Sequence, residues 1–164
     1  MITGELTTRV AAPEDEEFLW RLYASTRATE IAAWGWPPEE QERFLRMQYR
    51  ARRASYGSAA PDAEESVLLI GDVAVGAMRV SRTASELRLM DVALLPEHQN
   101  RGIGAQVLSQ LIREVRNSAL PLRLSVLRGN RAILLYKRLG FVIKAEDAMY
   151  IEMEYGIPSV PASE

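Results

Sequence analysis

The chain has no cysteine and only one histidine, His98, among its 164 residues. Without cysteine, a protein has no disulfide, no thiolate nucleophile and no cysteine-based zinc site. A single histidine cannot build a metal centre of several histidines. We therefore expect no metal cofactor and no covalent intermediate on a cysteine.

Long apolar runs are also missing. No run approaches the ~20 residues that a membrane-spanning helix requires, and the N-terminus lacks the apolar core of a signal peptide. The formal net charge is −2, which argues against general affinity for nucleic acid. We expect a soluble, cytoplasmic protein that binds neither membranes nor nucleic acid.

Hydrophobic residues make up 48% of the chain, enough for the core of one compact domain. The sequence shows no internal repeat and no linker between domains. We expect a single domain over residues 1–155 and a loose tail over residues 156–164, where two prolines and the lack of periodicity predict no regular structure.

Strand-like and helix-like segments alternate along the chain. Predicted strands cover residues 6–11, 66–70, 73–80, 87–95, 120–127, 141–144 and 149–155. Predicted helices cover residues 14–30, 38–55, 103–116 and 131–139, with loops at 56–63 and 117–118. The short turn at Gly71 and Asp72 predicts a hairpin. This order predicts an α/β (α+β) domain with a mixed, mostly antiparallel sheet flanked by helices.

The junction after residues 87–95 is the most informative part of the chain. That segment is apolar at nearly every position, which predicts a central strand covered on both faces, and Pro96 should end it. Gly102 and Gly104 then lead into a helix whose first N–H groups have no internal partner and favour a phosphate. The alternative is that the two glycines only form a tight turn.

Two familiar phosphate motifs do not fit this junction. A P-loop ends in Gly-Lys-Ser/Thr, and a dinucleotide fingerprint needs a third glycine. The pattern Gln99-x-x-Gly102-x-Gly104 instead resembles the pyrophosphate loop of the GNAT superfamily of N-acetyltransferases. Residues 130–141, NRAILLYKRLGF, are similar to the family pattern Asn-x-Ala-x-x-Leu-Tyr-x-x-x-Gly-Phe. Because the predicted order of elements is also the GNAT order, the resemblance covers nearly the whole chain.

The resemblance implies acetyl-CoA as acyl donor, CoA as product and a primary amine of a small molecule or peptide as acceptor. It also implies a set of cofactor-binding residues. These are Leu94, Gln99, Asn100, Arg101, Gly102, Ile103, Gly104, Ala105, Asn130 and Tyr136.

In the family, the two parallel strands beside the site splay apart and hold the pantetheine arm. The resemblance implies that Asn130 contacts this arm and that Tyr136 is the acid beside the leaving sulfur. A backbone N–H near Leu94 would stabilise the oxyanion during direct attack by the amine. The alternatives are a helix-capping Asn130 and a half-buried helical Tyr136.

The general base is less clearly indicated. At pH 7 only about one alkylamine in a thousand is neutral, so some group must accept a proton. Many relatives place a Glu where this chain has Arg88. Asp91 is the only acid within the strand, and we treat it as the candidate base or water relay, with a structural ion pair as the alternative. Glu30 and Glu39 are weaker candidates, and we expect His98 to be exposed.

The resemblance places the acceptor at the first two helices, the loop between them and the last hairpin. Two tryptophans and several acids there would suit an apolar cation, although packing and a solvated face explain them equally. They are Trp34, Trp36, Glu39, Glu40 and Glu42. Two other functions stay open: a CoA-binding or partner-binding module without turnover, and an enzyme for longer acyl donors. Many relatives dimerise, so a homodimer is a further option.

Overall fold

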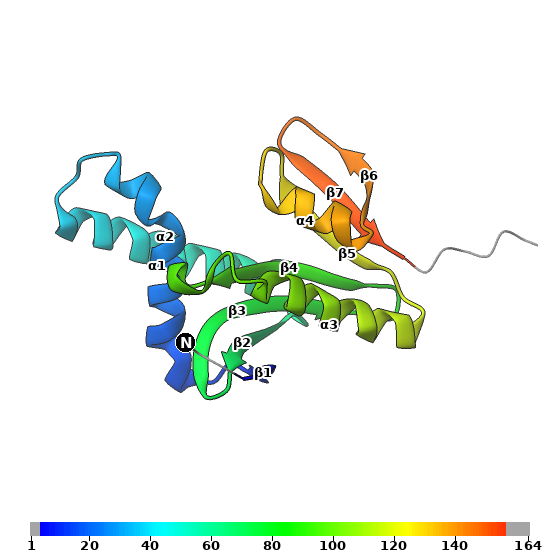
Figure 1. Ribbon diagram of the computed structural model, residues 1–164. Coiled ribbons are helices and arrows are strands. Elements are labelled where there is room, and N and C mark those ends of the chain that lie inside the picture. Colours follow the sequence, from blue (N-terminus) through cyan, green and yellow to red (C-terminus); the bar gives the residue numbers. More distant parts are fainter. Residues whose placement is uncertain (1–3, 157–164) are drawn as a thin grey trace, which may run out of the picture. The chain divides into compact units, whose positions relative to one another are not determined.

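The computed structural model of the protein describes residues 4–156 (Figure 1). The strands are β1 (Leu6–Val10), β2 (Glu64–Ile70), β3 (Val73–Arg82), β4 (Leu87–Leu94), β5 (Leu122–Leu127), β6 (Val142–Glu146) and β7 (Tyr150–Tyr155). The helices are α1 (Glu16–Ala32), α2 (Pro38–Ala59), α3 (Ile103–Ser118) and α4 (Ala132–Leu139), with short 3-10 turns η1 (Pro13–Asp15) and η2 (Pro96–His98). The predicted tail, apart from Gly156, lies outside the described residues.

The strands form one sheet in the order β1-β2-β3-β4-β5-β7-β6. The pairs β1–β2, β5–β7 and β6–β7 are antiparallel. The pair β4–β5 is parallel, with Leu87–Leu89 opposite Leu122–Leu124, and α3 supplies the crossover that a parallel pair requires. The predicted mixed, mostly antiparallel α/β fold is therefore confirmed, with the predicted central strand as the fourth of seven.

The described chain divides into two compact units, which we treat separately. The first unit contains the chain up to Arg79 together with Asp91–Arg101. The second unit contains Val80–Met90 and the chain from Gly102 onward. The expectation of a single domain over residues 1–155 stays a prediction.

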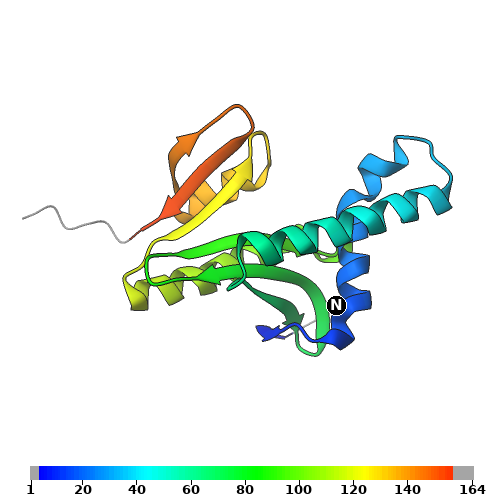
Figure 2. The same cartoon turned by 180° about the vertical axis from the view of Figure 1, so that it is seen from behind.

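In the first unit, α1 and α2 pack on each other and bury an aromatic core (Figure 2). The rings of Trp20 and Tyr49 meet edge to face with centroids 5.6 Å apart. The buried residues of this core are Leu19, Trp20, Leu22, Ile31, Leu45, Tyr49 and Ala77. Apolar residues at helical spacing on α1 and α2 therefore face each other, as amphipathic helices should.

The acidic turn before α1 is held by Asp15. Its carboxylate accepts hydrogen bonds from Arg9 Nη1 and Nη2, at 2.7 and 2.8 Å, and from the Ala12 N–H at 2.8 Å. The Arg9 hydrogen bonds, helped by that of Ala12, lower the pKa of Asp15 to about 2. This clamp ties the end of β1 to the start of the first helix, where the sequence predicts it.

The predicted loop over residues 56–63 is wrong for residues 56–59, because α2 continues to Ala59. Tyr56 explains the extension. Its hydroxyl accepts hydrogen bonds from Arg52, one helical turn earlier, at 2.9 and 3.1 Å, and its ring lies 4.6 Å from the Arg79 guanidinium. Such i,i+4 and tertiary contacts offset the low helix propensity of Gly57 and Ser58.

In the second unit, α3 buries all of the predicted apolar stripe, and α4 lies beside β5 and β7 (Figure 1). The stripe consists of Ile103, Val107, Leu108, Leu111, Ile112 and Val115. On β5 the alternating residues Leu122, Leu124 and Val126 are buried, as predicted. Gly140, at φ 109°, ends α4 as expected.

The predicted linker at Asn117 and Ser118 is wrong, because both residues belong to the last turn of α3. The Ser118 hydroxyl donates to the Glu114 carbonyl at 3.2 Å and so helps to close the helix. Ala119, at φ 58°, then turns the chain toward β5. Ala119 therefore takes the left-handed position that a glycine usually occupies at a helix end.

Gly76 allows close contact between β3 and the end of β4 in the first unit. A Cβ at this position would overlap the Ala93 carbonyl oxygen and lie 2.8 Å from a Leu94 methyl carbon. The Leu95 N–H donates to the Val75 carbonyl at 2.9 Å next to this contact. Backbone oxygen cannot rotate away, so the position requires glycine.

We predict that Gly76→Ala destabilises the protein by about 1–3 kcal/mol, because the methyl group forces the two strands apart. Thermal unfolding followed by circular dichroism should show a midpoint several degrees below that of the wild type. The matched control is Gly57→Ala within α2, where a Cβ meets nothing within 4 Å. That control should stabilise by about 0.5–1 kcal/mol. Equal midpoints for the two variants would contradict the close contact.

Candidate functional site

The end of β4 is fastened by the residues that follow it. The Gln99 side-chain amide donates to the Leu94 carbonyl at 3.0 Å. The His98 N–H donates to the Leu95 carbonyl at 2.9 Å and closes the η2 turn after Pro96. The expectation that His98 is exposed is wrong: this turn directs the chain inward, and the residue is 7% exposed.

The entry to α3 uses left-handed backbone twice. Asn100 has φ 60° and Gly102, the N-cap residue, has φ 82°. No side chain in the described chain caps this helix end, and the first backbone bond runs from Gln106 N–H to the Gly102 carbonyl at 3.1 Å. The N–H groups of Ile103, Gly104 and Ala105 therefore precede the first helical hydrogen bond, which is the arrangement that binds anions.

Gly104 leaves room beside these N–H groups. A Cβ built there would meet only a Leu135 methyl carbon, at 3.8 Å, which is ordinary contact. Leu135 precedes Tyr136 on α4, so the first turn of α3 and the helix that carries Tyr136 lie next to each other in the second unit. The residues present fit a phosphate-bearing ligand at this turn.

The side chain of Asn130 caps the start of α4. Its Oδ1 accepts a hydrogen bond from the Ala132 N–H at 2.8 Å, which is the capping role left open above. The same bond fixes the orientation of the side chain, and it uses the oxygen rather than the amide nitrogen. Contact with a pantetheine arm stays a prediction.

Tyr136 is more buried than a half-buried helical residue, with 7% of its surface exposed. Its ring packs against Phe141 with centroids 5.6 Å apart, and Phe141 N–H donates to the Tyr136 carbonyl at 3.0 Å. The Gly-Phe pair after α4 therefore fixes the position of the tyrosine ring. Its role as an acid stays a prediction.

Asp91 forms an ion pair with Arg52 of α2, with Oδ2 and Nη2 2.8 Å apart. The two side chains keep 39% and 41% of their surface exposed, respectively. Partial burial raises the pKa of Asp91, while Arg52 and, more weakly, Arg79 pull it down. The ion pair named above as the alternative is thus present, and catalysis by Asp91 stays a prediction.

Arg88, which stands where many relatives have a glutamate, is held by carboxylates in the second unit. Its Nη2 lies 2.5 Å from Glu152 of β7, and its Nε lies 3.4 Å from Glu86. The hydrogen bond to Glu152 raises the pKa of Arg88, so this position cannot accept a proton. Glu152 is a carboxylate that the sequence analysis missed, because only the strand register brings it close.

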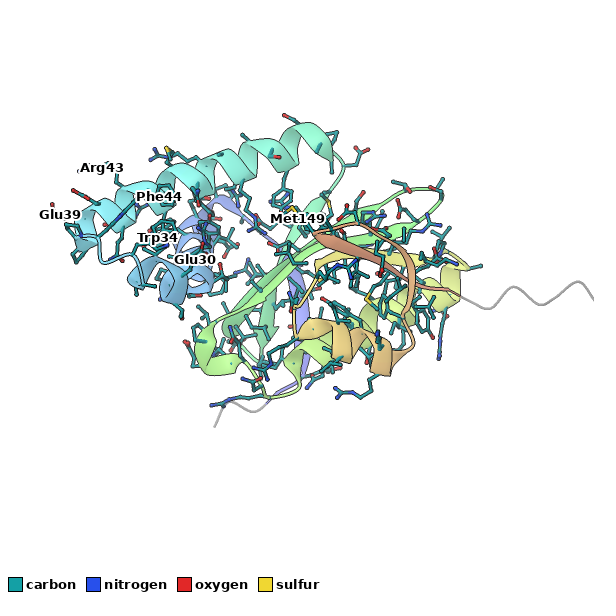
Figure 3. All side chains as sticks on the ribbon, turned by 90° about the horizontal axis from the view of Figure 1, so that it is seen from above. Glu30, Trp34, Glu39, Arg43, Phe44 and Met149 are labelled. Atoms are coloured by element: carbon teal, nitrogen blue, oxygen red, sulfur yellow. The ribbon has the colours of Figure 1, made fainter. Side chains whose placement is uncertain are left out.

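The tip between α1 and α2 carries three aromatic rings in mutual contact. The ring centroids of Trp34, Trp36 and Phe44 lie 5.1–5.5 Å apart. Trp34 and Trp36 remain 41% and 40% exposed. Figure 3 shows Trp34 and Phe44 side by side, with Glu30 and Glu39 on the same two helices. The rings pack together and also present an apolar surface.

Of the weaker base candidates, Glu30 already pairs with Arg27 at 2.9 Å. Glu39 lies in the first turn of α2, where the helix dipole favours a negative charge. Within residues 4–156, no group of three or more acidic or histidine side chains is placed to hold a metal ion. No helix in this part of the chain is long and apolar enough to cross a membrane.

A polar cavity of about 570 Å³ lies in the first unit. It is lined by the end of β1, the start of β2 and charged side chains that include Glu16, Arg53, Glu65 and Arg79. None of the predicted site residues lines it. Glu65 pairs with both arginines of the wall, with Arg53 at 3.1 Å and with Arg79 at 3.3 Å.

The predicted site residues are divided between the two units. The first unit holds Asp91, Leu94, Gln99, Asn100 and Arg101. The second unit holds Gly102, Ile103, Gly104, Ala105, Asn130 and Tyr136. The sequence analysis missed Arg52 and Tyr56, although their i,i+4 spacing on one helix is a usable signal for paired side chains.

Comparison with known proteins identifies the family. The sequence model of the acetyltransferase (GNAT) domain matches residues 63–143, from the start of β2 into β6. The PaiA N-acetyltransferase from Thermoplasma acidophilum, solved in complex with coenzyme A, is 20% identical. The match covers 93% of this chain and 99% of the PaiA chain, with a TM-score of 0.68.

Two further solved structures show the same fold. An acetyltransferase from Thermus thermophilus is 19% identical, covers 96% of this chain and 100% of that chain, and has a TM-score of 0.67. The ribosomal-protein-S18-alanine N-acetyltransferase from Escherichia coli is 18% identical. The match covers 98% of this chain and 99% of the Escherichia coli chain, with a TM-score of 0.66. A comparison with curated proteins gives no match. With its sequence match and its fold in agreement, the chain belongs to the GNAT family of acetyltransferases.

Proposed function

We propose that the protein is an acetyl-CoA-dependent N-acetyltransferase that acetylates a primary amine of a small molecule or peptide by direct attack. The observation that carries this proposal is the first turn of α3. There the left-handed Gly102 and the open space at Gly104 leave backbone N–H groups without a capping side chain. The relative from Thermoplasma acidophilum, which was solved in complex with coenzyme A, supports the same ligand here.

The pyrophosphate of acetyl-CoA would lie at this turn. The N–H groups of Gly102, Ile103, Gly104 and Ala105 would donate to its oxygens, and the helix dipole would add positive potential. Arg101 adds a cationic side chain, while Gln99 and Asn100 shape the turn that precedes the helix. In this proposal Asn130 binds the pantetheine arm through its amide nitrogen, since its oxygen caps α4.

Acetyl-CoA supplies an acetyl group activated as a thioester. Asp91 accepts one proton from the ammonium form of the acceptor, which frees the nitrogen lone pair for attack on the acetyl carbon. The backbone N–H at Leu94 stabilises the negative charge on the acetyl oxygen. Tyr136 donates a proton to the departing sulfur and regains one that the nitrogen loses when the amide forms. The net products are the amide, CoA and the one proton held by Asp91.

The acceptor surface in this proposal is the aromatic tip of α1 and α2. Trp34 and Trp36 offer exposed apolar rings, and Glu39 adds a negative charge nearby, so an amine with an apolar body suits the tip. The Escherichia coli relative is named for the alanine of ribosomal protein S18, which makes a peptide N-terminus a reasonable acceptor class. We further propose that the protein acts in the cytoplasm.

A second function is favoured by one observation. Arg88 occupies the position of the family's glutamate and is neutralised by Glu152 and Glu86. A domain that binds CoA or a partner but turns over slowly would look the same at this position. Turnover, rather than binding, separates the two functions.

The first test is calorimetric titration of the purified protein with acetyl-CoA, CoA and ATP. We expect micromolar dissociation constants for acetyl-CoA and CoA and none for ATP, because the α3 turn would bind the ligand together with Asn130 and Tyr136. An amine-library screen for CoA release then distinguishes an enzyme from a binding module. Absence of binding at millimolar acetyl-CoA would rule out the proposed cofactor.

We predict that Gly104→Leu weakens acetyl-CoA binding roughly 10- to 100-fold, because its side chain fills the space over the N–H groups and removes charge-assisted hydrogen bonds. The midpoint of thermal unfolding should stay close to the wild type, since a Cβ at position 104 meets only a Leu135 methyl carbon, at 3.8 Å, which is an ordinary contact. Gly57→Leu, a glycine with open space on α2, is the matched control. Unchanged affinity of Gly104→Leu would contradict the phosphate assignment.

We predict that Tyr136→Phe lowers kcat about 100-fold or more while the Kd for acetyl-CoA changes less than about threefold, because the lost hydroxyl acts on the leaving sulfur. Steady-state kinetics and calorimetry measure the two quantities. The control is Tyr155→Phe, since Tyr155 also packs on Phe141, at 5.8 Å, and its hydroxyl pairs with Arg116 instead. A Tyr136→Phe enzyme with wild-type kcat would remove this residue from the mechanism.

A further inference from the structure

Arg52 is held from three elements of the first unit at once. Its guanidinium lies 2.8 Å from Asp91 of β4, as described above, and donates from Nε and Nη2 to the Tyr56 hydroxyl at 3.1 and 2.9 Å. Its Cζ also lies 5.8 Å from the ring centre of Tyr23 on α1 and 5.4 Å from that of Tyr56. The planar guanidinium therefore has one orientation that satisfies all of these contacts.

This arrangement differs from an ordinary surface ion pair. An exposed pair contributes little because two long side chains must give up their rotamer freedom to meet. Here Tyr56 and Tyr23 fix the guanidinium independently of Asp91, so much of that entropy is lost whether or not the ion pair forms. Arg52 then acts as a fixed donor that orients a shorter, stiffer carboxylate.

Three side chains from the surrounding elements act on the Asp91 carboxylate: Arg52 and Tyr56 on α2 and Arg79 on β3. The Val92 backbone N–H also lowers the pKa of Asp91, whereas Tyr23 on α1 contacts Arg52 instead. Arg79 is already paired with Glu65, at 3.3 Å, and lies against the Tyr56 ring, at 4.6 Å. The described residues thus leave Arg52 as the cation in direct contact with Asp91, and Arg79 as a more distant, compensated charge.

We propose that Arg52, braced by Tyr56, is a positioning residue that holds the Asp91 carboxylate where it accepts the proton of the acceptor amine. The proposal rests on the proposed function. The ammonium N–H bond breaks, the proton moves to an Asp91 oxygen, and the electron pair stays on nitrogen for attack. Asp91 becomes neutral while Tyr56 keeps Arg52 in place, and loss of the proton to solvent restores the ion pair.

The direction of the pH effect follows from the charges. Asp91 must be ionised to accept a proton, so kcat falls as the pH drops through the pKa of Asp91 in the complex. Arg52 lowers this pKa, and its removal must raise it. In the profile of kcat against pH, the fall on the acidic side (the acidic limb) should therefore move to higher pH in Arg52→Gln. The constant kcat reached at higher pH (the plateau) should also fall about tenfold or more, because the carboxylate is less well oriented.

The experiment compares Arg52→Gln, Arg52→Lys and Tyr56→Phe with Arg53→Gln. Arg53 lies next to Arg52 on α2, has a similar exposed side chain at 34%, and pairs with Glu65 instead. We expect Arg52→Lys to restore the acidic limb but not the full plateau, since lysine keeps the charge and loses the two-pronged contact with Tyr56. Tyr56→Phe should lower the kcat reached at high pH, while kcat should fall on the acidic side at nearly the same pH as in the wild type. Arg53→Gln should leave both quantities close to the wild type.

A readout without substrate accompanies the kinetics. Carboxyl NMR of the free protein, with Asp91→Asn used for assignment, follows the titration of Asp91 directly. The Asp91 signal should titrate at higher pH in Arg52→Gln than in the wild type and should be nearly unmoved in Arg53→Gln. Thermal unfolding checks that each variant is folded.

The outcomes separate the two proposals. Failure of acetyl-CoA binding or of wild-type turnover overturns the proposed function. If the wild type is active and Arg52→Gln has the same profile of kcat against pH, the positioning role is overturned. Asp91→Asn with wild-type kcat overturns it too, because there would then be no base to position, although acetyl transfer would stand. We expect Asp91→Asn to lose about 100-fold or more in kcat.

Discussion

The first turn of α3 is the constraint on which the proposed site depends. Every helix begins with N–H groups that lack an internal partner, and this one has no capping side chain in the described chain. The chain reaches it through Pro96, which ends the strand segment, and through left-handed backbone at Asn100 and Gly102. Within the segment before the helix, the Gln99 side chain donates to the Leu94 carbonyl at the end of β4. The loop is thus shaped to leave donors without protein acceptors, which favours an anionic ligand.

Much of the fold could be predicted from short-range patterns. The six buried residues of α3, the alternation on β5 and the stop at Gly140 each depend on spacing within one element. One error arose where a distant residue decides, since Arg79 contacts Tyr56 at the end of α2. Another arose from a local turn, because the turn that begins at Pro96 ends in a buried His98. Likewise, the sequence could name Asp91 but not its partner, since α2 and β4 meet only in the folded chain.

The choice of arginine over lysine fits this pattern of contacts. The sequence has 20 basic residues, and only two, Lys137 and Lys144, are lysines. Several arginines make two-pronged or stacked contacts that an ammonium group cannot reproduce: Arg9 binds both oxygens of Asp15, and Arg52 bonds Tyr56 from two nitrogens. The folded chain uses the planar group to fix carboxylates and tyrosines at defined positions.

The environment of Asp91 reconciles two requirements that normally conflict. A carboxylate that is held firmly by a cation usually becomes a weaker base, because the cation lowers its pKa. Here partial burial outweighs the pull of Arg52 and Arg79, so the pKa of Asp91 is raised overall although the ion pair is intact. General-base catalysis improves as the pKa of the base approaches the working pH. The helix α2 thus supplies the cation that contacts Asp91, and in the proposed mechanism this carboxylate accepts the proton in a chain that has Arg88 at the usual glutamate position.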